Sequence, residues 1–165
     1  MNRLLLGVAI WVVLLMTAAG DLAWHYPQLP ARVATHFDAH GLADGWSSRS
    51  ALLTTSIVTL VVMSLVAGGL QLLVRFLPAS LINVPHREFW LAPARAEGTR
   101  RSVGQLMFAI GCLLFVMVAG LNHLTLRANL GPFPQMGFWM WFVVGSCVLS
   151  MQARILLTVL RFRRR

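Results

Sequence analysis

Long stretches of apolar residues alternate with short polar segments along this chain. Four apolar runs dominate, at residues 4–24, 51–77, 103–124 and 137–160. Each run reaches the roughly 20 residues that a helix needs to cross about 30 Å of hydrocarbon. The runs lack the period-two alternation that marks the strands of a membrane barrel, and a helix satisfies its backbone hydrogen bonds internally. The pattern therefore predicts four transmembrane helices.

The composition fits a chain that is embedded in lipid. Of the 165 residues, 58% are hydrophobic and only 12% are charged, and the charged residues lie almost wholly between or beyond the apolar runs. Four spans with short connections leave room for one compact bundle. We therefore expect an all-α membrane protein with a single integral membrane domain over residues 1–165. It would be a four-transmembrane-helix bundle with a structured extracytoplasmic loop and a cytoplasmic loop.

The first run shares one feature with a secretory signal, because the small residues from Thr17 to Gly20 stand near a possible cleavage position. A signal core has only about 7–15 apolar residues. This run is longer and continues through Leu22 to Trp24. We interpret it as an uncleaved anchor.

The arginines set the expected orientation, because positively charged loops resist translocation. One group lies at the N-terminus, in or beside the middle connection, or toward the C-terminus: Arg3, Arg75, Arg87, Arg95, Arg100, Arg101, Arg154, Arg161, Arg163, Arg164 and Arg165. The smaller group on the other side is Arg32, Arg49 and Arg127. We therefore expect a multi-pass protein of the inner (plasma) membrane with both termini cytoplasmic.

The net charge of +9 does not indicate a nucleic-acid partner, because no basic groove or aromatic platform accompanies it. Attraction to anionic lipid explains the arginine-rich segment 161–165 better. Cys112 and Cys147 lie inside predicted spans, where each acts as a small apolar filler. We expect the lipid bilayer as a partner, no nucleic acid and no cofactor, and the sequence leaves the oligomeric state open.

The outer loop after the first span is the first segment with chemically rich side chains. Its prolines end the first helix and its glycines permit tight turns. A short extended piece from Arg32 to Asp38 is expected. The alternation of a strand would put Val33, Thr35 and Phe37 on one face, toward the bundle or membrane, and His36, Asp38 and His40 on the other.

This second set has the character of a metal site, because imidazole and carboxylate groups are zinc ligands. Residues at the ends of the first and third spans can join His36, Asp38 and His40, namely Asp21, His25, Asn122 and His123. An H-x-D-x-H pattern does not by itself define four ligands. The alternative is that the ring of His36 hydrogen-bonds a backbone carbonyl or Asp44, which would hold the loop as a lid over the bundle.

The rest of the outer loop predicts scaffold roles. Gly41 permits a tight turn, Asp44-Gly45 serves another turn, and Ser47 or Ser50 caps the second helix. Arg49 would then lie in the first turn of that helix at the headgroup level. Tryptophans favour the membrane interface, and those expected at the outer boundary are Trp24, Trp46, Trp139 and Trp141.

The connection between the second and third spans is the second rich segment. Pro85 and Pro93 bracket at most about two helical turns, and Phe89 with Trp90 would lie in the membrane interface. Thr99 is a candidate cap for the third helix. His86 has no nucleophile or second histidine beside it in the sequence, so an ordinary polar role is expected for it.

Both rich segments carry a family resemblance. The first includes Leu29-Pro30, Thr35-His36-Phe37-Asp38, Gly41, Asp44-Gly45-Trp46 and Arg49. The second is the stretch N-V-P-H-R-E-F-W-L-A-P at residues 83–93, which is similar to a pattern N-x-P-x-x-x-[YF]-W-L-A-P. Together they resemble the signature of a bacterial membrane family, domain of unknown function 1648, which also forms the N-terminal part of the SdpI immunity proteins.

The resemblance implies an architecture and a class of function. SdpI proteins protect a producing cell from a secreted peptide toxin and, when the toxin is present, hold a transcriptional repressor at the membrane. Their further C-terminal spans are absent from this sequence. The resemblance implies no catalytic residue for this chain.

We therefore expect a recognition, immunity or regulatory protein of the SdpI-like class. A peptide or lipid ligand would meet the outer loop, whose ligand-binding or loop-structuring residues would be His36, Asp38, Gly41, Asp44, Trp46, Arg49, Asp21 and His123. A cytoplasmic regulatory protein would meet Asn83, Pro85, Trp90 and Pro93. The alternative is a membrane metal-binding protein or metal-dependent hydrolase that uses His36, Asp38 and His40.

Two further expectations concern the helices. Asp21 and His123, at the outer ends of two helices, can tie the loop to the bundle. A proton-coupled exporter is disfavoured, because none of the five acidic residues lies near the middle of a span. Small residues allow helices to approach closely, and the candidates are Gly68, Gly69, Gly111 and Gly120.

Overall fold

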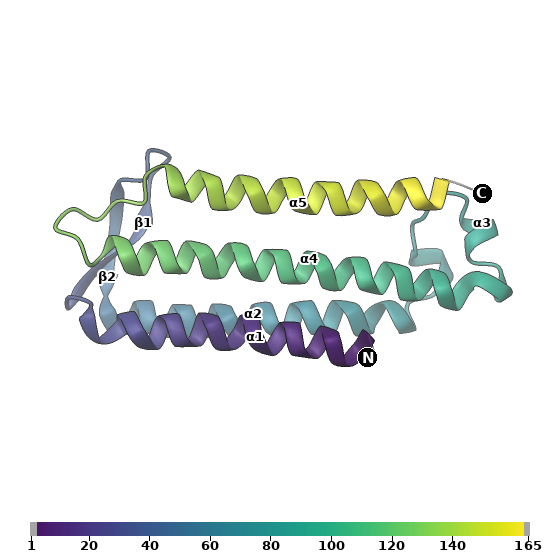
Figure 1. The fold of residues 1–165 in the computed structure, drawn as a ribbon, viewed down its shortest axis with the longest axis horizontal. Helices are drawn as coiled ribbons and strands as arrows, with labels where there is room; N and C mark the ends of the chain where they lie inside the picture. Colours follow the sequence, from purple (N-terminus) through teal and green to yellow (C-terminus); the bar gives the residue numbers. More distant parts are fainter. Residues whose placement is uncertain (1–2, 164–165) are drawn as a thin grey trace. The chain divides into compact units, whose positions relative to one another are not determined.

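A computed structural model describes residues 3–163 of the chain (Figure 1). Its long helices are α1 (Arg3–His25), α2 (Arg49–Phe76), α4 (Pro93–Ala128) and α5 (Phe138–Arg163). The short elements are the 3-10 turns η1 (Tyr26–Gln28) and η2 (Ala79–Leu81), the one-turn helix α3 (Arg87–Trp90), and the strands β1 (Arg32–Phe37) and β2 (Ala43–Ser48).

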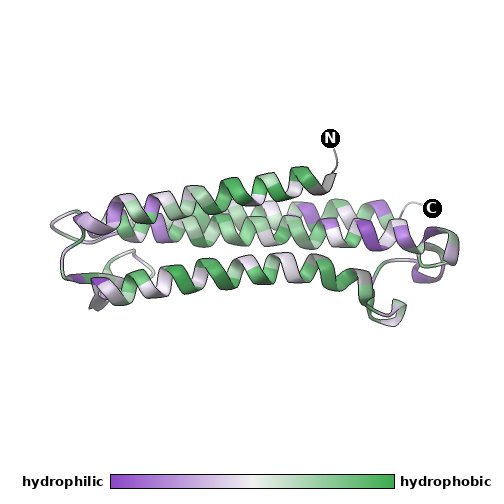
Figure 2. Cartoon of the chain, turned by 90° about the horizontal axis from the view of Figure 1, so that it is seen from below, coloured by the Kyte–Doolittle hydropathy of each residue, from purple (hydrophilic) through white to green (hydrophobic). Residues whose placement is uncertain are grey.

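The prediction of four helices capable of crossing a membrane is confirmed. In the described part of the chain, four helices are long and apolar enough to do so, as in a multi-pass membrane protein. Figure 2 shows hydrophobic residues dominating these helices. Only 6 to 18% of the residues in their most apolar windows are buried inside the protein. Most residues in these windows are therefore at least partly exposed, and those of α4 are mostly half-buried.

The start of α4 differs from the expected position. We expected the third span from residue 103, with Thr99 as its cap, but the helix begins at Pro93. Proline suits the first position of a helix, because its fixed φ is helical and its missing N–H has no partner there anyway. Thr99 lies inside α4 and is buried, and its hydroxyl donates to the carbonyl of Trp90 at 2.7 Å. The cap assignment was wrong because hydropathy does not detect the polar first turns of a helix.

The chain packs as two compact units, each with its own buried cluster. The hairpin unit comprises the chain up to Val62 together with Phe115–Ser146, and the loop unit comprises Met63–Leu114 together with the chain from Cys147. The core of the hairpin unit is formed by Leu22, Leu29, Val33, Leu52 and Leu126. A buried cluster of the loop unit is formed by Ile82, Val84 and Phe162.

The two strands of the hairpin unit form an antiparallel sheet with an irregular register. Pairs run regularly from Arg32↔Ser48 to Ala34↔Trp46, and the register then shifts on both sides of His36. The strand β1 confirms the extended piece that we expected. Its predicted faces were partly wrong, because Val33 and Ala34 are both buried while Thr35 is exposed. A bulge interrupts the alternation of side chains, and the sequence gives no period-two signal for it.

The segment that we expected as a turn at Asp44-Gly45 is instead part of β2. Gly45 is opposite His36, and a Cβ on this glycine would lie only 2.7 Å from the Cβ of His36. The true reversal lies at residues 38–42, where Gly41 has a φ of +79°. The backbone of this tip also pairs with the α4–α5 connection, since the N–H of Met136 donates to the carbonyl of Gly41 at 2.9 Å.

The cap of α2 is neither Ser47 nor Ser50. The backbone N–H of Ala51 donates to the hydroxyl of Ser48 at 3.1 Å, which places Ser48 at the N-cap, and the hydroxyl of Ser50 contacts that of Ser48 at 3.0 Å. The helix therefore begins one residue after the strand ends. This direct junction fixes β2 to the start of α2.

Close helix approach occurs at two of the four glycines that we named. A Cβ at Gly111 would lie 2.5 Å from that of Ala67, and one at Gly120 would lie 3.1 Å from a methyl of Val143. The prediction was wrong for Gly68 and Gly69, where a Cβ would meet nothing within 4 Å. Gly68 and Gly69 are exposed, so they do not face a neighbouring helix.

Candidate functional site

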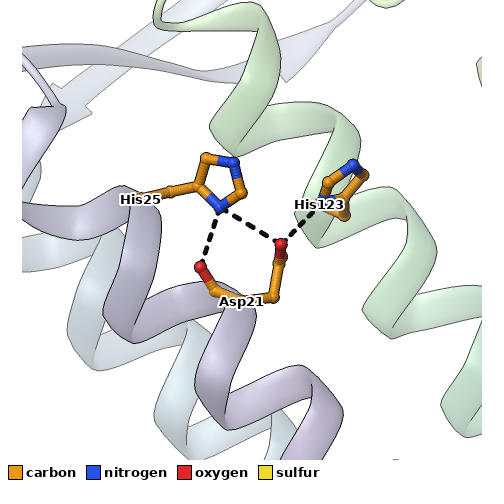
Figure 3. A group of neighbouring side chains, drawn as sticks. All are labelled: Asp21, His25 and His123. Atoms are coloured by element: carbon orange, nitrogen blue, oxygen red, sulfur yellow. Dashed lines mark hydrogen bonds and ion pairs between the residues drawn. The ribbon is translucent and has the colours of Figure 1, made fainter.

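Two histidines of the hairpin unit converge on one aspartate. The Nδ1 atom of His123 lies 2.7 Å from Oδ1 of Asp21, and the Nδ1 atom of His25 lies 3.1 Å from the same oxygen (Figure 3). The Nδ1 atom of His25 is also 2.8 Å from the backbone carbonyl oxygen of Asp21. One ligand-type atom from each residue lies within 4.8 Å of the others.

Two helices position this triad. Asp21 and His25 are four residues apart on the last turns of α1, so their side chains share one face of the helix. His123 comes from α4, near its C-terminal end. His25 is 9% exposed, while the side chains of Asp21 and His123 are 21% and 42% exposed. The site is thus half-buried, and its most accessible member is His123.

The contacts with Asp21 define which nitrogen of each imidazole ring donates a hydrogen bond. A carboxylate and a backbone carbonyl only accept hydrogen bonds. Both imidazoles therefore donate from Nδ1 in this arrangement. The two rings also meet edge to face, with centroids 5.5 Å apart and planes at 79°. A polar triad of this kind links α1 to α4, whereas we expected Asp21 and His123 to hold the outer loop.

His123 is also part of the wall of an open groove. The groove has a volume of about 410 Å³ and is lined by His123, Leu124, Arg127, Ala128, Gln135, Met136 and Trp139. All of these residues belong to the hairpin unit. The triad is therefore next to a space that a small molecule or water can enter. The positively charged guanidinium of Arg127 belongs to the same lining.

Among the described residues 3–163, the triad is the one group of three or more histidine, cysteine or acidic side chains whose potential ligand atoms lie close together. The residues of the H-x-D-x-H pattern lie differently. His36 pairs with Asp44, Nδ1 to Oδ1, at 2.5 Å, as in one of the two alternatives that we considered. Asp38 instead accepts the backbone N–H groups of His40 and Leu42 at 2.8 and 2.9 Å. The pattern in the sequence does not bring His36, Asp38 and His40 to one point.

The contacts of Asp38 shift its proton affinity. The hydrogen bond from the backbone N–H of Leu42 is the main cause that lowers the pKa of Asp38 below its ordinary value, with a further contribution from the N–H of His40. Asp38 is half-exposed, and its carboxylate closes the turn at the tip of the hairpin. These two hydrogen bonds stabilise the turn.

A single amide side chain attaches the hairpin to α4. The carboxamide of Asn129 accepts the N–H of Ala34 at 2.6 Å and donates to the carbonyl of Ala34 at 2.8 Å. It also donates to the carbonyl of Thr125 at 2.8 Å. Asn129 is buried, 4% exposed. We did not predict this residue, because asparagine near a helix end is too common to mark a contact 95 residues away in sequence.

The two outer edges of the sheet differ in how their outward backbone groups are hydrogen-bonded. The N–H and carbonyl of Ala34 point away from β2, so Ala34 and Trp46 are a non-hydrogen-bonded pair. The backbone groups of Trp46 then also point away from β1. The sheet has two strands, so within the described residues no third strand covers that edge. Asn129 satisfies the outward backbone groups of Ala34 on β1. Directly before β2, Leu42 forms an isolated antiparallel bridge with Gln135 of the α4–α5 connection. Farther along β2, at Trp46, no strand among the described residues pairs with the outer side.

Two arginines of the hairpin unit lie over aromatic rings. The guanidinium of Arg32 lies 5.6 Å from the ring centroid of Trp46, and that of Arg49 lies 5.1 Å from that of Tyr26. Arg49 also donates to the carbonyl of Leu29 at 3.2 Å. Trp46 is 45% exposed. The hairpin thus presents an accessible indole and guanidinium beside the outward-pointing backbone groups of Trp46.

The second predicted surface lies in the loop unit. The indole of Trp90 donates from Nε1 to the carbonyl of Phe162 at 2.7 Å, and the two rings meet edge to face. Arg95 stacks on Phe89 at 3.8 Å. Asn83 and Pro93 are exposed and Pro85 is half-buried. Trp90 therefore fastens the connection to α5, and Asn83 and Pro93 are accessible beside it.

Comparison with known proteins agrees with the first of the two resembling segments. Residues 11–60 match the sequence model of a family described as Domain of unknown function (DUF1648). No curated protein and no solved structure matches the chain. The match covers α1 from Trp11 onward, both strands and the first part of α2, and thus includes Asp21, His25 and the whole hairpin. This part of the chain is therefore similar to the DUF1648 family.

Proposed function

We propose that the chain is a multi-pass bacterial membrane protein of the SdpI-like class that recognises an extended peptide outside the cell and a regulatory protein inside it. The outer side of β2 at Trp46, where no third strand pairs within the described residues, is the observation that carries the outer half of this proposal. An extended peptide that joins a sheet edge gains main-chain hydrogen bonds and places alternate side chains in nearby pockets. Each such hydrogen bond contributes about 0.5–1.5 kcal/mol.

The hydrogen bonds between Asn129 and Ala34 support this proposal. A hairpin of two strands is marginally stable alone, but here β1 is held by Asn129 and β2 runs directly into α2 through the cap at Ser48. The edge of β2 is thus ordered before any ligand binds. Preorganisation reduces the entropy cost of binding, and Trp46 with Arg32 offers the kind of side chains that dominate binding energy.

The orientation follows from the arginines. Lipid would cover the outward-facing apolar side chains of α1, α2, α4 and α5, with the hairpin outside the inner membrane and both termini in the cytoplasm. The segment around Asn83 and Pro93 would then face a cytoplasmic partner. A cysteine placed at Ala39 should react with an impermeant thiol reagent added to intact cells, and a reporter fused after Arg163 should be active in the cytoplasm.

Peptide recognition is tested by selection on the purified protein in lipid nanodiscs. A phage-displayed library of random peptides is the probe, and selected peptides are then resynthesised with an N-methyl group at each backbone amide in turn. Strand addition predicts that methylation at every second position abolishes binding. Binding that is insensitive to all methylations, or that shows no such alternation, contradicts the proposal.

A pair of variants isolates the backbone group of the protein. Trp46→Pro removes the indole and the outward N–H, whereas Trp46→Ala removes the indole alone. The selected peptide should bind Trp46→Pro at least several-fold more weakly than Trp46→Ala, since only the former lacks the donor. Equal affinities would place the peptide elsewhere.

A further inference from the structure

We infer that Asp21, His25 and His123 form a binding site for a divalent transition-metal ion of the zinc type. This inference goes beyond peptide recognition and does not depend on it. It concerns the facing sides of α1 and α4, whereas the proposed peptide edge is on β2. The two ideas can therefore fail separately.

The distances are close to those that a metal ion requires. Zinc binds histidine nitrogen and carboxylate oxygen at about 2.0–2.1 Å in tetrahedral geometry, which places its ligand atoms about 3.3 Å apart. Oδ1 of Asp21 lies 2.7 Å from Nδ1 of His123 and 3.1 Å from Nδ1 of His25. One ligand-type atom of each of the three residues lies within 4.8 Å of those of the others. Small rotations of side chains would open the space for an ion. The helices would not need to move.

The kinds of ligand select the class of ion. Two imidazoles favour zinc, copper, nickel or cobalt over magnesium and calcium, which prefer sets of oxygen ligands. One carboxylate offsets part of the charge of a divalent ion. Binding through the converging Nδ1 atoms would move the ring hydrogen of each histidine to Nε2. The hydrogen bonds of the two rings to Asp21 hold the three side chains close to the ligand geometry.

The surroundings leave a position for a fourth ligand. His25 is buried, but His123 is half-exposed and is part of the wall of the groove with Arg127, Gln135 and Trp139. A zinc ion with three protein ligands keeps its fourth position for water or an exchangeable ligand. The guanidinium of Arg127 in the same groove favours an anionic group there. The site would therefore bind metal together with a water or a small carboxylate or phosphate.

The test uses the full chain in nanodiscs after chelation and removal of metal. Cobalt(II) chloride and zinc chloride are the probes. One cobalt ion per chain should bind with the strong visible absorption of tetrahedral cobalt, and zinc should displace it. His25→Ala and His123→Ala should each weaken binding by more than the roughly 10–100-fold that loss of an outer partner of a metal site costs.

Matched controls separate a metal site from a structural network. The double variant His36→Ala/His40→Ala removes two exposed histidines from the same unit and should bind cobalt with unchanged affinity. Asp21→Asn keeps the size of the side chain and covers the case in which a histidine variant fails to fold. It should keep the helical circular dichroism and lose tetrahedral cobalt.

Two results would overturn the inference. One is a folded wild-type protein that binds no cobalt or zinc at micromolar concentration. The other is a bound ion that survives Asp21→Asn and His123→Ala or disappears in the His36→Ala/His40→Ala control. Either result would leave the triad as hydrogen bonds between α1 and α4 and would not affect peptide binding at β2.

Discussion

The side chain of Asn129 binds Ala34 as a neighbouring strand would, accepting its N–H at 2.6 Å and donating to its carbonyl at 2.8 Å. One amide group thereby replaces a third strand on one edge of the sheet. Asn129 thus holds β1 at Ala34, whereas no strand among the described residues pairs with the outer side of β2 at Trp46. This asymmetry is the basis of the proposed recognition surface.

Asn129→Ala should therefore loosen the hairpin. The change leaves the buried N–H and carbonyl of Ala34 without partners, at a cost of about 1–3 kcal/mol for each group. We expect a lower midpoint of thermal unfolding in nanodiscs and faster proteolysis within residues 38–42. Gln28→Ala removes an exposed hydrogen bond to the carbonyl of Trp24 and should leave both measurements almost unchanged. Equal stability of the two variants would show that the hydrogen bonds between Asn129 and Ala34 do not stabilise the hairpin.

The sequence predicted the helices much better than the hairpin. The length and hydropathy of a span are local properties, so the positions of α1, α2 and α5 agree with the expected runs to within a few residues. The start of α4 at Pro93 was missed because its first turns are polar. Within the outer loop, β1 was expected and β2 was not, since A-D-G-W-S-S has neither alternation nor a strong strand composition.

The candidate site was only partly visible in the sequence. Asp21, His25 and His123 were each noted as polar residues at span ends, but only as additional members of a cluster around His36 or, for Asp21 and His123, as ties between the loop and the bundle. Their actual convergence depends on which faces of α1 and α4 meet, and that is a tertiary property. The contact between Ala34 and Asn129 was not predictable for the same reason. The side chains that matter most at this site are paired across about 100 residues.

Gly45 is expected to tolerate no side chain. A Cβ there would lie 2.7 Å from the Cβ of His36 across the sheet, so Gly45→Ala must displace a strand. Overpacking of this kind costs about 1–3 kcal/mol. Gly20→Ala is the matched control, because a Cβ at Gly20 meets nothing within 4 Å and alanine favours a helix interior by about 0.5–1 kcal/mol. Thermal unfolding should show opposite shifts, and a stabilising Gly45→Ala would contradict the register.

The tip of the hairpin should weaken in acid. Hydrogen bonds from Leu42 and His40 lower the pKa of Asp38 below its ordinary value of 3.8. A lowered pKa in the folded state means that this stabilisation is complete above the pKa of the unfolded chain and is lost as the pH falls through the folded pKa. Amide hydrogen exchange at Leu42 should therefore accelerate below about pH 4 relative to the intrinsic rate. Asp38→Asn should remove this dependence, and an unchanged acid profile in that variant would assign it to another group.

Gly111 and Ala67 provide a test of helix packing in the loop unit. A Cβ at Gly111 would lie 2.5 Å from that of Ala67, so Gly111→Ala forces α2 and α4 apart and should lower the unfolding midpoint. The double variant Gly111→Ala/Ala67→Gly moves the methyl group to the other helix and should recover much of the loss. Residues in contact commonly show coupling energies of about 0.5–3 kcal/mol in such a cycle. Additive effects of the two substitutions would mean that these helices do not meet at this pair.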